Sequence, residues 1–131
     1  MVVKAKKGVL FFCNDQTLCE SIALYLSGWY PASCVRTFKD LEAHLAEHGA
    51  SLLLLDLQLS EEPVNRVVRI KQAYPHIPII VAFVYSRATL HLESQLRPVV
   101  DRWFYKPFDL DEIRKSVDAL LDRAVSTKQK N

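Results

Sequence analysis

The chain has 131 residues and a formal net charge of +2; half of its residues are hydrophobic and 24% are charged. This length predicts a single domain with its own core, and so small a net charge gives no reason to expect nucleic acid as a partner. The sequence has neither an apolar run of membrane-spanning length nor a signal-peptide pattern. We therefore expect a cytoplasmic protein without a membrane partner.

The first third of the chain alternates apolar runs with amphipathic segments. The run 8–13 predicts a strand covered on both faces, and the residues after it predict a helix opened by a capping box at 17–20. A short strand is expected at 33–36. A second helix follows, with Thr37 at its start and Gly49 at its end.

The middle of the chain carries the most informative run. Residues 51–55 predict a buried strand, and Asp56 follows at its end, where an unpartnered carboxylate would be costly to bury. A loop is predicted at 60–63, because it contains Pro63 beside polar residues. A third helix is expected from Val64 to about residue 74.

The last third repeats the alternation. Strands are predicted at 79–84 and 101–105, and a weaker helix at 86–96 lies between them. After Lys106 and Pro107 comes the clearest helix, whose apolar stripe is Leu110, Ile113, Val117, Leu120 and Leu121.

Five strand–helix units in this order predict an α/β fold: a flavodoxin-like (βα)5 three-layer sandwich with a parallel sheet of strand order 2-1-3-4-5. The predicted domain spans residues 8–124, between a basic tail at 1–7 and a polar tail at 125–131. In this strand order the carboxyl ends of strands 1, 3 and 5 lie at one edge of the sheet. That edge would bring together Asn14, Asp15, Asp56 and Lys106.

Two smaller patterns allow further interpretations. The odd number of cysteines (Cys13, Cys19 and Cys34) favours free thiols in a reducing cytosol. The stretch from His44 to His48 matches the H-x-x-E-H zinc pattern, with both histidines on one helical face. Since no third ligand is evident, a solvated helix face is the simpler interpretation of this pattern.

Residues 53–57 and 103–108, together with the five strand–helix units, resemble the receiver domain of two-component response regulators over about residues 9–121. The resemblance implies that Asp56 accepts a phosphoryl group from a histidine kinase or phosphotransfer protein, and that Lys106 contacts that group. It implies a signalling module and not an enzyme. Homodimerisation or contact with an output domain would use the face formed by the fourth helix, fifth strand and fifth helix.

The chain departs from the family pattern at positions that matter. Where the family has an acidic pair that holds Mg²⁺, this chain has Cys13 and Asn14, so the expected metal ligands (Asp56, Asn14 and Asp15) form a weakened site. Phe83 replaces the Thr or Ser that hydrogen-bonds the phosphate. Trp103 occupies the aromatic switch position.

These departures leave three functional hypotheses open. The preferred one is a phosphorelay receiver with atypical activation. The second is a pseudo-receiver that binds a partner whether or not Asp56 is phosphorylated, and the third is a small-molecule or metal enzyme on a flavodoxin-like fold. An apolar partner surface is a further expectation, formed by Leu90, Leu92, Leu96 and Trp103.

Overall fold

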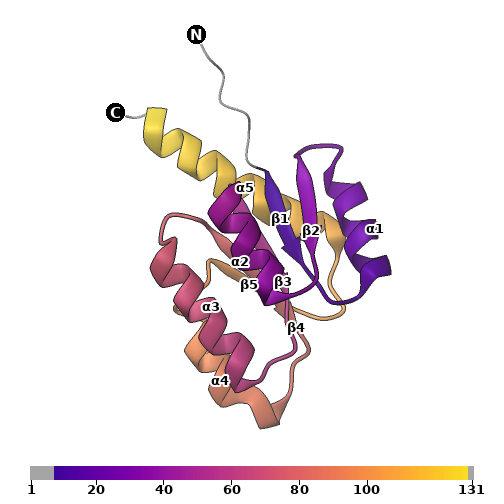
Figure 1. Ribbon diagram of the computed structural model, residues 1–131, viewed down its shortest axis with the longest axis vertical. Coiled ribbons are helices and arrows are strands. Elements are labelled where there is room, and N and C mark those ends of the chain that lie inside the picture. The colour runs from indigo at the N-terminus through magenta and orange to yellow at the C-terminus, as the bar shows by residue number, and fades with distance from the viewer. Residues whose placement is uncertain (1–7, 130–131) are drawn as a thin grey trace.

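The computed structural model describes residues 8–129, with side chains described from 8 to 122, so the predicted tail at 1–7 lies outside the described residues. Strands and helices alternate along the chain (Figure 1). In order they are β1 (Val9–Phe12), α1 (Gln16–Leu26), β2 (Ala32–Val35), α2 (Phe38–Glu47), β3 (Leu52–Asp56), α3 (Glu61–Ala73), β4 (Ile79–Phe83), the 3-10 turn η1 (Arg87–Thr89), α4 (Leu90–Leu96), β5 (Arg102–Tyr105) and α5 (Leu110–Gln129).

The five strands form one parallel sheet in the order β2-β1-β3-β4-β5, which confirms the predicted topology. β1 and β3 are paired in the middle of the sheet, with Phe12 opposite Leu55. Asp56 is the last residue of β3 and pairs with Ala82 of β4. The acceptor candidate therefore lies where a central strand ends.

The sheet separates two apolar cores, because successive side chains of a strand point to opposite faces. On one face, α2, α3 and α4 pack against side chains such as Leu53 and Leu55. On the other face, α1 and α5 pack against Leu52 and Leu54. This arrangement is the predicted three-layer sandwich, and Figure 1 shows α2 and α3 on the same side of the sheet.

Two helices begin earlier than the sequence analysis predicts. The N-cap of α1 is Asp15, whose side chain accepts a hydrogen bond from the Leu18 N–H at 3.0 Å, so the capping box predicted at 17–20 is wrong. α3 begins at Glu61, so the loop predicted at 60–63 is wrong as well. Pro63 fits inside the first turn because the N–H groups there have no partner within the helix.

Other local predictions fare differently. Thr37 caps α2 by accepting from the Asp40 N–H at 3.0 Å, as predicted. Gly49 follows that helix with a φ of +71°, a conformation that glycine adopts without strain. α5 continues to Gln129, which is past the domain boundary predicted at residue 124.

The expectation of three free thiols is wrong for two of the cysteines. Cys19 of α1 and Cys34 of β2 form a disulfide, with their Cα atoms 6.0 Å apart. Cys13 is a free thiol. An odd count is equally consistent with one pair and one free cysteine, and the sequence alone could not show that α1 packs against β2.

Candidate functional site

Asp56 and Lys106 form an ion pair at the carboxyl edge of the sheet. The Lys106 Nζ donates to both carboxylate oxygens of Asp56, at 3.0 Å to Oδ1 and 3.1 Å to Oδ2. The Asp56 side chain is 9% exposed and that of Lys106 31% exposed, so the pair is partly shielded from water. Lys106 precedes Pro107 through a cis peptide bond. The two residues that topology predicted to meet are therefore in direct contact.

A third group contacts Asp56 that the sequence analysis did not place there. The Cys13 thiol, fully buried at the end of β1, donates to Asp56 Oδ2 at 3.2 Å. Loss of hydration on burial raises the pKa of Cys13 to about 11, which keeps the thiol protonated and able to donate. A sequence signal was present, because the resemblance to receiver domains matches Cys13 with one of the acidic residues that would lie beside Asp56.

An open pocket of about 620 Å³ lies above this pair. Lys106 and Asp56 share it with Asn14, while Phe12 and Phe38 provide an aromatic wall with ring centroids 4.6 Å apart. The remaining lining residues come from the segments that follow β3 and β4, including the first turn of α3 and the η1 turn: Leu57, Gln58, Leu59, Ser60, Pro63, Val84, Ser86 and Thr89. The pocket therefore combines one ion pair with amide groups, hydroxyl groups and apolar side chains.

The residues present do not fit a magnesium ion. Asn14 lines the pocket, whereas Asp15 uses its carboxylate to cap α1. Among residues 8–122, whose side chains the structure describes, no group of three or more His, Cys, Asp or Glu side chains is arranged to hold a metal. Mg²⁺ prefers several hard oxygen ligands, and a protonated thiol is not one of them. The weakened Mg²⁺ site proposed from Asp56, Asn14 and Asp15 stays a prediction without support from this geometry.

Phe83 lies next to the site in sequence but points into the core. Its side chain is 1% exposed and packs edge-on against Tyr105, with ring centroids 5.7 Å apart. Its backbone still touches the site, because the Lys106 N–H donates to the Phe83 carbonyl at 2.9 Å. The position at which the resemblance implies a hydroxyl is therefore filled by a ring that does not line the pocket.

A polar cluster connects α4 to β5 behind Phe83. Glu93, which is 3% exposed, accepts a hydrogen bond from the Tyr105 hydroxyl at 2.7 Å and pairs with Arg97. The Arg97 guanidinium also stacks over the Trp103 ring, 5.1 Å from its centroid. The spacing of Glu93 and Arg97 suits a helical ion pair, but no sequence signal pointed to Tyr105.

The predicted apolar surface is only partly present. Leu92 and Leu96 are buried in the core, whereas Leu90 and Trp103 are each 39% exposed. α4 therefore uses its leucines mainly to pack on the sheet. Trp103 remains accessible beside Arg97.

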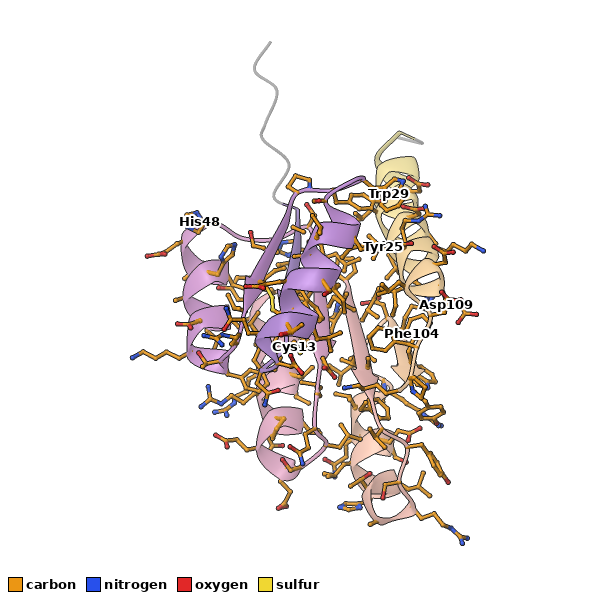
Figure 2. All side chains as sticks on the ribbon, turned by 90° about the vertical axis from the view of Figure 1, so that its right-hand side faces the viewer. Cys13, Tyr25, Trp29, His48, Phe104 and Asp109 are labelled. Atoms are coloured by element: carbon orange, nitrogen blue, oxygen red, sulfur yellow. A yellow bond between two sulfur atoms is a disulfide. The ribbon has the colours of Figure 1, made fainter. Side chains whose placement is uncertain are left out.

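The histidine pair on α2 lies away from the pair of Asp56 and Lys106. The His44 and His48 ring centroids are 4.9 Å apart, which confirms that they share one helical face. Figure 2 shows His48 at one end of α2, well separated from Cys13. Since a third ligand is absent from the described part of the chain, the arrangement gives no support to a zinc enzyme.

The fold is that of response regulator receiver domains. The structure is similar to a CheY-like receiver domain protein from Methanospirillum hungatei JF-1, with a TM-score of 0.83 and 17% identity, covering 94% of this chain and 99% of that one. It is also similar to the receiver domain of NtrX from Brucella abortus, with a TM-score of 0.74 and 17% identity, covering 87% and 98%.

Among curated proteins, the transcriptional regulatory protein CitT of Bacillus subtilis (strain 168) is 28% identical over 97 residues, which is 73% of this chain. The matched region spans 42% of that regulator's length. No family model matches the chain. Within residues 8–129 no helix is long and apolar enough to cross a membrane.

Proposed function

We propose that the chain is a cytoplasmic receiver module of a two-component phosphorelay, in which Asp56 accepts a phosphoryl group from a histidine kinase or phosphotransfer protein. The observation that carries the proposal is the contact of Lys106 with both carboxylate oxygens of Asp56, which together line an open pocket of about 620 Å³. The receiver-domain fold of the chain supports it.

The chemical step needs one nucleophile and one cation. A carboxylate oxygen of Asp56 attacks the phosphorus, the bond from phosphorus to the donor breaks, and the donor leaves with the electron pair of that bond. Lys106 then pairs with the new phosphoryl oxygens instead of with the carboxylate. The amide of Asn14 lines the same pocket and supplies a neutral hydrogen-bond donor.

In this proposal, phosphorylation of Asp56 changes the surface formed by α4, β5 and α5. Phosphorylation would draw Lys106 toward the phosphoryl group, and the Lys106 N–H is hydrogen-bonded to Phe83 at the end of β4. Phe83 packs on Tyr105, which holds α4 through Glu93. A partner such as a second copy or an output domain would then distinguish the two states of this surface.

A second candidate function is favoured by the Cys13 contact. Asp56 Oδ2 accepts from both Lys106 and Cys13, so the carboxylate is already satisfied in the absence of any ligand. A pseudo-receiver would need no phosphoryl group at this position, because the packing of its core would set its binding surface. Its partner would bind whether or not Asp56 carries phosphate.

The two functions are separated by incubating the protein with acetyl phosphate, with and without Mg²⁺, and measuring the intact mass. We expect wild type to gain one phosphoryl group and Asp56→Asn to gain none. A conventional receiver treated alongside serves as the positive control. If the conventional receiver reacts and wild type does not, the phosphoacceptor role is contradicted.

A binding measurement then tests the alternative. Captured partners are compared between wild type and Asp56→Ala, each with and without acetyl phosphate treatment. A pseudo-receiver keeps the same partner and affinity in all samples. A phosphorelay receiver changes its affinity only in the treated wild type.

A further inference from the structure

Two of the three cysteines are placed to react with each other. Cys19 lies in the first turns of α1 and Cys34 in the edge strand β2, fifteen positions apart in sequence and 6.0 Å apart at Cα. That separation is close to the most common Cα distance in protein disulfides. Figure 2 draws the link as a yellow bond. The sheet register sets the distance between the two cysteines. Cys34 of β2 pairs with Phe11 of β1, and α1, which carries Cys19, follows shortly after β1.

The two sulfur atoms differ in access to reagents. Cys19 is 2% exposed and belongs to the core beneath α1, whereas Cys34 is half-buried on the edge strand. An attacking thiolate must reach one sulfur of the disulfide along the direction of the S–S bond. Cys34 is therefore the sulfur that solvent thiols reach first.

The third cysteine is chemically unsuited to compete. Cys13 is fully buried and its thiol donates to Asp56. In the folded chain this burial keeps the Cys13 sulfur out of reach of oxidants and of dissolved thiols. Oxidation should therefore select the Cys19–Cys34 pair and leave Cys13 as a thiol.

We propose that Cys19 and Cys34 form a reversible redox crosslink that is opened and closed by thiol–disulfide exchange at Cys34. Disulfides in cytoplasmic proteins are usually transient or redox-sensing, and a cytoplasmic location is part of the proposed function. The redox chemistry itself does not depend on phosphoryl transfer to Asp56.

The exchange balances with a small thiol such as glutathione. A glutathione thiolate attacks the Cys34 sulfur, the Cys19–Cys34 bond breaks, and Cys19 leaves as a thiolate that takes up a proton. A second glutathione thiolate attacks the glutathione sulfur of the mixed disulfide and releases Cys34 as a thiol. The sum is one protein disulfide and two thiols converted into two protein thiols and one glutathione disulfide.

The crosslink lies close to the acceptor pocket along the backbone. The Cys19 N–H makes the first hydrogen bond of α1, to the Asp15 carbonyl at 2.9 Å. The Cys13 N–H donates to the carbonyl of Val35 at 3.1 Å, and Val35 is the residue after Cys34. The closed disulfide therefore adds a second link between the end of β2 and the segment that carries Asn14. Opening it frees the first turn of α1 to move relative to the pocket.

The test equilibrates the full chain in buffers of graded reduced and oxidised glutathione, blocks thiols with N-ethylmaleimide in denaturant, and counts added groups by intact mass. We expect one added group in oxidising buffer, on Cys13, and three in reducing buffer. Closing a loop of this length should raise Tm by about 10 °C. Hydrogen exchange over residues 14–19 should slow in the oxidised form.

Two variants serve as matched controls. Cys34→Ser should take up two groups at every glutathione ratio and lose the redox dependence of Tm; Cys19→Ala tests the same point from the buried side. Cys13→Ser should keep the transition, from no added group to two. The proposal is overturned if wild type takes up three groups, or one group, across the whole range. A redox-dependent Tm that persists in both Cys34→Ser and Cys19→Ala would contradict it as well.

Discussion

Asp56 accepts hydrogen bonds from two donors of different kinds. Lys106 brings a positive charge that neutralises the carboxylate, while the Cys13 thiol is neutral and a weak donor. An acidic side chain at position 13 would instead place a like charge beside Asp56 and favour binding of a cation. With a carboxylate at position 13, that side chain and Asp56 would repel each other, whereas the Cys13 thiol donates a hydrogen bond to Asp56.

Restoring the acidic pair should restore a metal response. In Cys13→Asp/Asn14→Asp, three carboxylates would meet around Lys106, and their repulsion should lower the free energy of unfolding by about 2 kcal/mol without metal. Mg²⁺ should recover this loss, as measured by thermal unfolding with and without the ion.

Asp15→Asn is the control for that experiment. It changes a carboxylate that caps α1, so it should lower stability slightly without creating a Mg²⁺ response. If wild type and the double variant respond to Mg²⁺ equally, the explanation based on Cys13 and Asn14 is wrong.

The buried thiol also predicts a pH dependence of stability. Burial raises the pKa of Cys13 from 9.0 to about 11, so the unfolded chain loses this proton at lower pH than the folded chain. The contribution is complete below pH 9 and is lost as the pH rises to about 11, by about 2 kcal/mol.

Urea unfolding under reducing conditions measures this loss. The decrease in unfolding free energy between the two pH values should be larger in wild type than in Cys13→Ser, because a serine hydroxyl does not ionise in this range. Equal decreases in the two proteins would show that Cys13 does not contribute.

At the scale of elements, the contact between α4 and β5 depends on one buried carboxylate. Glu93 belongs to a helix of seven residues, which is too short to be stable without tertiary contacts. Its partners Arg97 and Tyr105 satisfy the carboxylate from the helix and from the strand. The orientation of α4 is therefore linked to β5 by a specific hydrogen bond in addition to apolar packing.

Tyr105→Phe should remove that hydrogen bond while keeping the ring that packs against Phe83. We expect a lower unfolding free energy and faster hydrogen exchange in α4. Tyr85→Phe is the matched control, since Tyr85 is half exposed and packs edge-on against the same Tyr105 ring. An equal effect of both substitutions would mean that the hydroxyl of Tyr105 has no special role.

Helix boundaries show what local sequence can and cannot predict. The sequence predicts the Thr37 cap correctly because a capping residue and the helix it caps are adjacent in sequence. The observed α1 begins two residues before the predicted start because Asp15 and Thr17 are both suitable caps, and only the path of the chain from β1 selects between them. Local signals therefore predict that a helix exists better than where it begins.

At the scale of the whole molecule, the sheet depends on a central strand that contributes to both cores. Leu53 and Leu55 pack under α2 and α3, and Leu54 packs under α1 and α5. Each of these leucines is at most 2% exposed. A substitution that leaves a cavity in either core should therefore lower the free energy of unfolding.

Leu54→Ala should lower the free energy of unfolding by about 3 kcal/mol, because it removes buried surface and leaves a cavity between β3 and the two helices. Leu24→Ala is the control, since Leu24 is 76% exposed on α1 and should change stability by less than about 0.5 kcal/mol. Denaturant unfolding monitored by circular dichroism gives both values. Similar losses for the two variants would contradict this account of the core.

The fold was predictable because its evidence is periodic and spread over the chain. Five alternations of strand and helix permit few topologies. The strand order β2-β1-β3-β4-β5 places Asp56 and Lys106 at the same edge of the sheet. The contacts that were missed join residues far apart in sequence on particular faces, such as Cys13 with Asp56 and Cys19 with Cys34. Their detection requires the strand register and the packing of α1, which no single segment encodes.

The buried ring of Phe83 has a mechanical consequence for the molecule. A hydroxyl at this position could follow a ligand by rotating about one side-chain bond, whereas a ring packed on Tyr105 is held by its neighbours. A displacement of the Lys106 backbone would reach Phe83 through the hydrogen bond from the Lys106 N–H to the Phe83 carbonyl, and would move the end of β4 as a unit. Such a movement shifts a strand end and not a single side chain, so it should be slower than a side-chain rotation. We therefore expect the end of β4 to have few intermediate positions.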